Sequence, residues 1–269
     1  MVQVRPVTYR FPALPMPLPF PLPVLLLVAA PFVGSFLGVL IKRLPAGRPT
    51  LIARSVCDHC QRTLGFGDLL PIVSWVSARG RCRYCKAAIG FFYPAVELAA
   101  FAVALWAVLV LPDWIAWAGA AFGWGLLTLA WIDQEHFFLP DVVTLPLGLV
   151  GLAVAWLIDP GTFLNHLIGA AVGFALFAGL ARLYHRLRRR EGLGEGDAKL
   201  LGTLGAWVAW QGLPTVILYA AVSGLVLALL LMVRGRHVEL GLRLPFGPHL
   251  CLGGWLVWLY GPLVPIQIP

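Results

Sequence analysis

Long apolar stretches separated by short polar segments dominate the chain. A helix that crosses a bilayer needs about 20 apolar residues, or fewer when polar side chains at its ends reach the interface. Eight stretches approach this length, and the one at 200–213 is the shortest. The pattern therefore predicts an all-α polytopic membrane protein with about eight transmembrane helices. We expect them at residues 24–41, 95–111, 114–132, 142–158, 163–183, 200–213, 214–233 and 248–264.

Composition excludes the main alternatives to a membrane protein. Of 269 residues, 60% are hydrophobic and only 12% are charged, and the mean hydropathy is +0.86. A soluble domain carries about 25% charged residues and cannot bury this much apolar surface. Eleven Trp and the low charge exclude a disordered chain. Five Cys are too few for a secreted disulfide scaffold of this length.

The basic residues predict the orientation in the membrane. The net charge of +8 could indicate nucleic-acid binding, but nine basic residues crowd between Lys42 and Lys86 and none occurs from 87 to 181. In membrane proteins such clusters mark cytoplasmic loops. With eight spans, every cluster after the N-terminal tail falls on one side, in loops at 42–94, 133–141, 184–199 and 234–247. We therefore expect the lipid bilayer as a partner, no nucleic acid, and a cytoplasmic loop at 42–94.

That loop contains two pairs of cysteines, Cys57 with Cys60 and Cys82 with Cys85, separated by 21 residues. Each C-x2-C pair can bind one metal ion from a tight turn, and four thiolates suit tetrahedral zinc. Disulfides do not persist in the cytosol, which favours metal over oxidised cysteines. Four protein ligands leave no open position for water. We predict a small domain with structural zinc, and four unliganded cysteines are the alternative.

Two groups of acids lie at predicted cytoplasmic ends of spans, one around Asp133 and one around Asp197. Acids at membrane depth are costly and are therefore candidates for function. Two carboxylates held close together can share a proton, so that one activates water and the other protonates a leaving amine. The alternative is a solvated cluster at the membrane boundary, with Asp141 as a helix cap. Glu97, just inside the second span, is either a helix cap or an ion-pair partner of the Arg-rich loop, or else a ligand contact.

At these residues the chain resembles the type IV prepilin peptidases, which are bifunctional leader peptidases and N-methyltransferases. The resemblance extends from about Gly34 to Gly261. It rests on six short motifs in the same order. They are Gly34-Ser35-Phe36-Leu37 with Arg43-Leu44-Pro45, the two cysteine pairs with Pro71 and Ser74-Trp75 between them, Tyr93-Pro94-Ala95-Val96-Glu97-Leu98, Asp133 through Asp141, Gly194-x-Gly196-Asp197-x-Lys199-Leu200, and Pro245-Phe246-Gly247-Pro248.

The resemblance implies an aspartic endopeptidase of the bacterial cytoplasmic (inner) membrane with Asp133 and Asp197 as the catalytic pair. Its substrates would be prepilins or pseudopilins, cut at the cytoplasmic face. The new N-terminal amine would then be methylated from S-adenosylmethionine, for which Glu97 and Gly90 are the candidate binding residues.

The implied domains are a Pro-rich tail at 1–23, a first span at 24–41, a cytoplasmic four-Cys and methyltransferase domain at 42–94, and a transmembrane peptidase domain at 95–269.

Two other functions fit parts of the sequence. A magnesium-dependent transferase acting on polyprenyl phosphates would hold metal with acids and phosphate with the Arg clusters. It would need several acids at helical spacing around each site, and Asp197 has only Glu191 and Glu195 nearby. A transporter or zinc-dependent sensor would carry acids in the middle of its spans, and the predicted span interiors contain none.

Overall fold

A computed structural model describes residues 22–50, 54–188, 194–234 and 245–263 of the chain. These residues form helices and contain no β-strand, only two isolated β-bridges in the cysteine loop. The predicted Pro-rich tail at 1–23 lies almost wholly outside the described residues. The helices are α1 (Leu22–Arg43), α2 (Val73–Ser77), α3 (Phe92–Val110), α4 (Asp113–His136), α5 (Asp141–Ile158), α6 (Phe163–Arg188), α7 (Glu195–Val233) and α8 (Gly247–Tyr260), with 3-10 turns η1 (Phe66–Asp68) and η2 (Pro160–Thr162).

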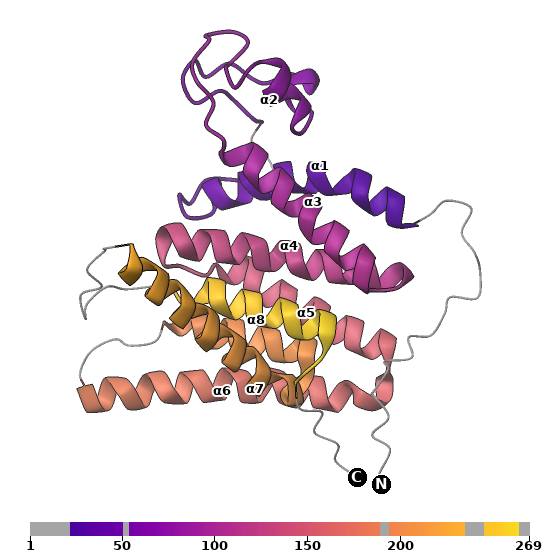
Figure 1. Cartoon of the computed structure of the whole chain (residues 1–269), viewed down its shortest axis with the longest axis vertical. Helices are drawn as coiled ribbons and strands as arrows, with labels where there is room; N and C mark the ends of the chain where they lie inside the picture. The colour runs from indigo at the N-terminus through magenta and orange to yellow at the C-terminus, as the bar shows by residue number, and fades with distance from the viewer. Residues whose placement is uncertain (1–21, 51–53, 189–193, 235–244, 264–269) are drawn as a thin grey trace. The chain divides into compact units, whose positions relative to one another are not determined.

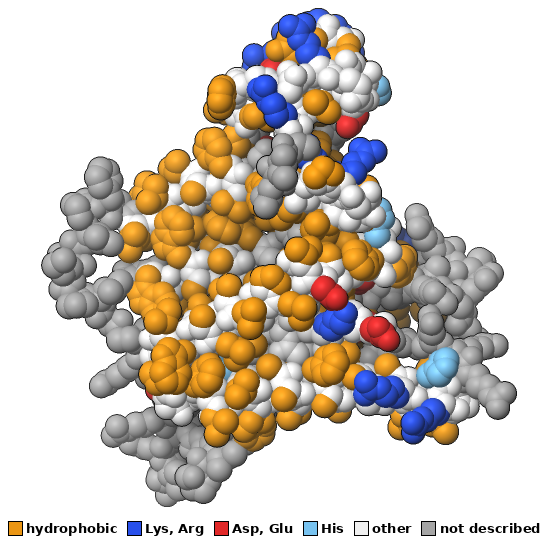
Figure 2. Space-filling view, turned by 180° about the vertical axis from the view of Figure 1, so that it is seen from behind, with side chains coloured by type: hydrophobic (Ala, Val, Ile, Leu, Met, Phe, Trp, Pro, Cys, Tyr) orange, Lys and Arg blue, Asp and Glu red, His pale blue; other side chains and the backbone are white. Residues whose placement is uncertain are grey.

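Six of these helices, among the described residues, are long and apolar enough to cross a membrane: α1, α3, α4, α5, α6 and α7. The first five predicted spans each coincide with one of the helices α1, α3, α4, α5 and α6 to within a few residues. This confirms the prediction of an all-α, multi-pass chain. Hydrophobic side chains cover most of the visible face of these helices (Figure 2).

The predicted count of eight spans is not confirmed. The spans expected at 200–213 and 214–233 lie in one helix, α7, which is 39 residues long. The helix is interrupted at Ala209, whose φ of 57° and ψ of 175° are not helical. The predicted boundary lies between residues 213 and 214, whereas the backbone breaks at Ala209. The last span is also shorter than predicted, because α8 has 14 residues.

Contacts with α8 show that the chain reverses direction at Ala209. Before the break, Leu204 packs at Gly254 and Trp207 stacks edge-on against Trp258, so α8 runs parallel to this part of α7. After the break, Val216 packs at Gly253 and Ser223 hydrogen-bonds His249, so α8 runs antiparallel to this part. The two parts of α7, residues 195–208 and 210–233, are therefore antiparallel legs.

The chain forms two compact units, with the boundary between Pro140 and Asp141. In the first unit α1, α3 and α4 pack together and carry the cysteine loop; in the second, α5, α6 and α8 surround α7 (Figure 1). The predicted boundary at 94/95 between a methyltransferase and a peptidase domain divides the chain by role, and it stays a prediction.

Small residues bring the helices of each unit close together. A Cβ atom at Gly205 would overlap the backbone of Gly169, so α6 and α7 touch backbone to backbone there. In the first unit a Cβ at Gly34 of α1 would lie 2.7 Å from the Cα of Glu97 in α3. Lipid chains are as apolar as Leu, so membrane helices associate largely through such close packing.

Candidate functional site

The two cysteine pairs form two turns with the same hydrogen bonds. In the first, the Cys57 carbonyl accepts from the Gln61 N–H at 2.9 Å and the Cys57 N–H donates to the Arg62 carbonyl at 3.0 Å. In the second, the Cys82 carbonyl accepts from the Lys86 N–H at 3.0 Å, and the Cys82 N–H donates to the Ala87 carbonyl at 2.8 Å. Each of these residues in the second turn lies 25 positions after its counterpart in the first turn. Two copies of one turn therefore present the thiols.

The four thiols converge. The sulfur atoms of Cys57, Cys60, Cys82 and Cys85 all lie within 4.8 Å of one another, and the Cys57 and Cys85 sulfurs are 3.9 Å apart. Tetrahedral zinc with Zn–S bonds of about 2.3 Å holds its sulfurs about 3.8 Å apart. The donor set thus fits a tetrahedral metal ion. The predicted ligands are brought together, and Cys251 in α8 is not part of the cluster.

Electrostatics in the cluster already favour one thiolate. Hydrogen bonds from the backbone of Cys85 and Tyr84 lower the pKa of the Cys82 thiol to about 7. At Cys85 the backbone of Ala87 acts in the same sense, but burial and the neighbouring thiols together raise its pKa to about 11. Four thiols in contact cannot all lose their protons without a cation to offset the charge.

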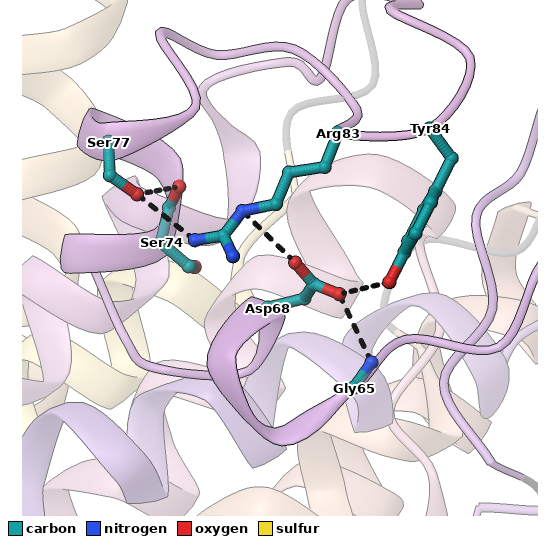
Figure 3. A network of polar contacts seen from close by, with 6 residues as sticks. All are labelled: Gly65, Asp68, Ser74, Ser77, Arg83 and Tyr84. Atoms are coloured by element: carbon teal, nitrogen blue, oxygen red, sulfur yellow. Dashed lines mark hydrogen bonds and ion pairs between the residues drawn. The ribbon is translucent and has the colours of Figure 1, made fainter.

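Asp68 organises the loop between the two turns, as Figure 3 shows. Its carboxylate pairs with Arg83 Nε at 3.3 Å and accepts from the Gly65 N–H at 3.1 Å and the Tyr84 hydroxyl at 3.3 Å. Arg83 also donates to the Ser77 hydroxyl at 3.3 Å. The network fastens the segment around η1 and α2 to the second cysteine turn. Sequence reasoning missed Asp68, although an isolated acid in an Arg-rich loop was a usable signal.

Glu97 is buried in α3, with 5% of its surface exposed. Its Oε2 accepts a hydrogen bond from the backbone N–H of Ile72 at 2.7 Å, and the Ser35 side chain of α1 hydrogen-bonds to it as well. Gly34 packs directly against its backbone. Glu97 therefore joins α1, α3 and the cysteine loop. The sequence predicted a cap, an ion-pair partner or a ligand contact, and the bond from Ile72 is a hydrogen bond that holds the loop.

Gly90, the other candidate for binding the methyl donor, lies in the exposed turn just before α3. A Cβ atom at Gly90 would meet nothing within 4 Å. The structure does not bring Gly90 and Glu97 into contact: one is open to solvent and the other is buried. Their proposed role in methyl transfer stays a prediction.

Asp133 lies in the last turn of α4 and is 6% exposed. Two residues later, Glu135 accepts from Lys42 Nζ at 3.0 Å and from the Trp131 indole at 2.9 Å. Lys42, from the end of α1, also lies 4.2 Å from the centre of the Phe92 ring at the start of α3. The end of α4 that carries Asp133 is therefore beside the attachment points of the cysteine loop.

Asp197 is the third residue of α7 and is partly exposed. Its N–H donates to the Gly194 carbonyl at 3.1 Å, and its carboxylate folds back over that residue, where a Cβ would lie 3.5 Å from Oδ2. Two residues later, Lys199 donates to both carboxylate oxygens of Asp141 at 2.8 Å. We had considered Asp141 as a helix cap; it begins α5, and its carboxylate is held by this ion pair.

Asp133 and Asp197 belong to different compact units, so their pairing stays a prediction. What the structure adds is a lysine–carboxylate pair next to each of them, Lys42 with Glu135 and Lys199 with Asp141. These pairs join residues 93 and 58 positions apart. Charge counting along the chain gives no signal for such partners.

Two family models match the chain. Residues 28–111 match the Bacterial Peptidase A24 N-terminal domain, and residues 120–229 match the Type IV leader peptidase family. The second match contains both Asp133 and Asp197. The first contains all four clustered cysteines and Glu97.

Curated proteins match over most of their length. A protein of Burkholderia pseudomallei (strain 1026b) is 38% identical, over 85% of this chain and 82% of its own. One of Stutzerimonas stutzeri is 36% identical over 87% and 89%, and one of Pseudomonas aeruginosa 35% over 85% and 87%. Each is named prepilin leader peptidase/N-methyltransferase. No solved structure matches. None of these matches supports a magnesium-dependent transferase.

Proposed function

Because the chain belongs to the type IV leader peptidase family, we propose that it removes the leader peptides of type IV prepilins and pseudopilins and methylates the new N-terminal amine. One observation carries the proposal: a single family match, residues 120–229, holds both aspartates at the charged ends of their helices. The relatives' shared name supports both activities.

Helix direction supports a division of labour between the aspartates. A helix carries partial positive charge at its N-terminus and partial negative charge at its C-terminus. Asp197 in the first turn of α7 is therefore favoured as a carboxylate, and it is partly exposed. Asp133 in the last turn of α4 is buried, which favours the protonated acid. We assign Asp197 as the general base and Asp133 as the general acid.

In this mechanism the Asp197 carboxylate removes a proton from water as the water oxygen attacks the carbonyl carbon of the scissile bond. Asp133 donates its proton to the amide nitrogen as the C–N bond breaks. The products are a leader carboxylate and a free amine, and the proton on Asp197 then restores Asp133. Such acid–base catalysis needs no covalent intermediate.

The chain itself limits how far these two ends can separate. Four residues, 137–140, join the end of α4 at His136 to the start of α5 at Asp141. Five Cα–Cα steps span at most about 17 Å when extended. Asp141 is bound to Lys199, two residues after Asp197. This covalent link is compatible with the pairing of the two aspartates that the proposal requires.

We propose eight crossings, with the two antiparallel legs of α7 and the short α8 each counted as one. The charged ends of the helices, including the Lys42–Glu135 and Lys199–Asp141 pairs, then face the cytoplasm of the bacterial inner membrane. A prepilin leader that stays in the cytoplasm would meet the aspartates at this face.

For methyl transfer we propose the cysteine loop, with structural zinc held by Cys57, Cys60, Cys82 and Cys85. S-adenosylmethionine, when bound, supplies an electrophilic methyl group to the new amine. Gly90 is open to approach by a ligand, whereas Glu97 is engaged by Ile72 and Ser35. We propose that Glu97 positions the loop for the methyl donor and that Gly90 contacts it.

Mass spectrometry of a prepilin coexpressed with the full chain tests both activities at once. Loss of the leader reports peptidase activity, and the added mass of one methylene group reports methylation. A prepilin that keeps its leader beside correctly inserted enzyme would refute the proposed peptidase, and a cleaved but unmethylated product would refute the transferase.

A further inference from the structure

The segment between the two cysteine turns, residues 66–77, has an exposed apolar stripe. Between Asp68 and Arg79 the chain carries no charged residue. Five large apolar side chains of the segment are 40% to 94% exposed: Phe66, Leu69, Leu70, Val73 and Val76. They lie in η1, in the turn that follows it and in α2, and we call these five side chains the apolar stripe.

The other face of the segment is fixed to the protein. Pro71 is buried, and Trp75 packs against Gly80 and donates its indole N–H to the Ile89 carbonyl at 3.1 Å. Asp68 holds the start of the segment to Arg83. These contacts hold the segment in place, so the stripe is exposed on a structured part of the loop.

The hydrogen bond from Ile72 to Glu97 sets the depth of the segment. Glu97 lies five residues after the start of α3, and its other partner, Ser35, lies eight residues before the end of α1. At about 1.5 Å per residue these positions are about 7 and 12 Å inside the helix ends. The headgroup layer of a bilayer is about 5–8 Å thick on each side. If the ends of α1 and α3 mark the outer surface of the headgroups, Ile72 is level with the boundary between headgroups and acyl chains.

The backbone at Ile72 forms an unusual turn. Its φ of 60° and ψ of −51°, with a hydrogen bond from Val73 N–H to the Pro71 carbonyl, form a γ-turn with positive φ. This conformation is rare, especially for a β-branched residue. It persists because Glu97 and Pro71 hold the turn in place.

Basic side chains follow the stripe directly. Arg79, Arg81 and Lys86 are exposed, and Figure 2 shows Lys and Arg side chains next to hydrophobic ones on the part of the loop that carries α2. Lysine and arginine side chains near a membrane surface attract anionic lipid headgroups.

We propose that residues 66–77 insert into the lipid leaflet beside α1 and α3, with the apolar stripe among the acyl chains and the basic residues on anionic headgroups. The cysteine loop is then anchored to the membrane by this segment as well as by the two helices that flank it. The proposal rests on contacts within the first unit and does not depend on the peptidase mechanism.

Photocrosslinking of the full chain in vesicles tests this placement. A benzophenone amino acid replaces Val73 or Val76, and, as a matched control, the exposed Thr63 of the first cysteine turn. The vesicles contain phosphatidylcholine with a minor share of phosphatidylglycerol. We expect severalfold more lipid adduct from positions 73 and 76 than from 63, at equal bound metal, and less adduct when phosphatidylglycerol is omitted.

Equal adduct at all three positions would overturn the insertion, and so would a crosslink to added prepilin in place of lipid. Adduct independent of phosphatidylglycerol would overturn the headgroup contact. Because benzophenone is itself apolar, a probe at Phe66 is tested with and without V73D/V76D. Insertion predicts that the two aspartates reduce its lipid adduct severalfold while metal content is unchanged; unchanged adduct would overturn it.

Discussion

The end of α4 (residues 131–136) and the start of α7 (residues 194–199) each carry a lysine–carboxylate pair next to a predicted catalytic aspartate, but the two pairs are built in opposite ways. In the first, the residue two after the aspartate is an acid, Glu135, and the lysine comes from α1. In the second, the residue two after it is the lysine, Lys199, and the acid comes from α5. In each pair the lysine offsets the charge of a carboxylate other than the predicted catalytic aspartate.

The difference lies in helix direction and burial. Asp133 ends a helix and is buried, whereas Asp197 begins one and is partly exposed. In the proposed mechanism, these opposite helix ends would give different protonation states to two chemically identical groups. This teaches that the roles of acid and base need not be encoded in residue type.

The largest effect is expected from replacing either aspartate. We expect D133N and D197N each to lower prepilin cleavage by about 10²–10⁴-fold, the usual contribution of a general acid or base. The double variant should be no worse than the poorer single one, because the two act as a unit. Cleavage is followed by mass spectrometry with E135Q as the matched control, which keeps both aspartates. Normal cleavage by either single variant would rule out the pair.

Removing two of the four cysteines tests the predicted metal site in the loop beside the end of α4. We expect C57S/C60S to lose its bound metal, because two thiolates cannot complete a tetrahedral site, and the loop to become protease-sensitive. Metal content of the purified protein is the measurement. C251S, which alters a buried cysteine outside the cluster, should keep its metal. Equal metal in both variants would contradict the site.

Overpacking tests the support of the α7 start. G205L places a side chain into the backbone of α6, and we expect it to destabilise the protein by about 1–3 kcal/mol or more. G179L is the matched control, because a Cβ at Gly179 meets nothing within 4 Å. The temperature of thermal unfolding in detergent should fall for G205L and not for G179L. Equal stability would mean that α6 and α7 are not in backbone contact.

The ion pairs should matter least. K199M and K42M each remove the lysine partner of a carboxylate, but both pairs are substantially exposed. Exposed pairs contribute about 0–1 kcal/mol, so kcat/KM for cleavage should change by less than about tenfold. A shift in the pH profile of kcat/KM is the sharper readout, because an extra negative charge favours protonation of its neighbour. A loss as large as that of D197N would place the lysine in the chemistry itself.

The sequence predicted what depends on local pattern. Apolar stretches located five spans, and the C-x2-C spacing located a metal cluster whose turns are closed by hydrogen bonds within each repeat. It did not predict the reversal at Ala209. No glycine or proline marks that position, and the break is accommodated by packing: Gly169 allows close approach, and His166 hydrogen-bonds the Ala206 carbonyl at 3.0 Å.

The sequence also did not predict polar contacts between residues far apart in the chain. Glu97 was singled out by its place at the membrane edge, but its partner is a backbone N–H made available by an unusual turn at Ile72. Composition and spacing describe side chains, and they carry no record of which main-chain groups a fold leaves to be satisfied.

The repeated cysteine turns have a consequence for how the ion comes and goes. Each turn contributes one buried sulfur, Cys57 or Cys82, and one exposed sulfur, Cys60 or Cys85. A chelator arriving from solution can therefore displace the outer two ligands first, one from each turn, while the inner two keep their hold. Exchange can proceed stepwise, without any helix of the bundle having to unpack.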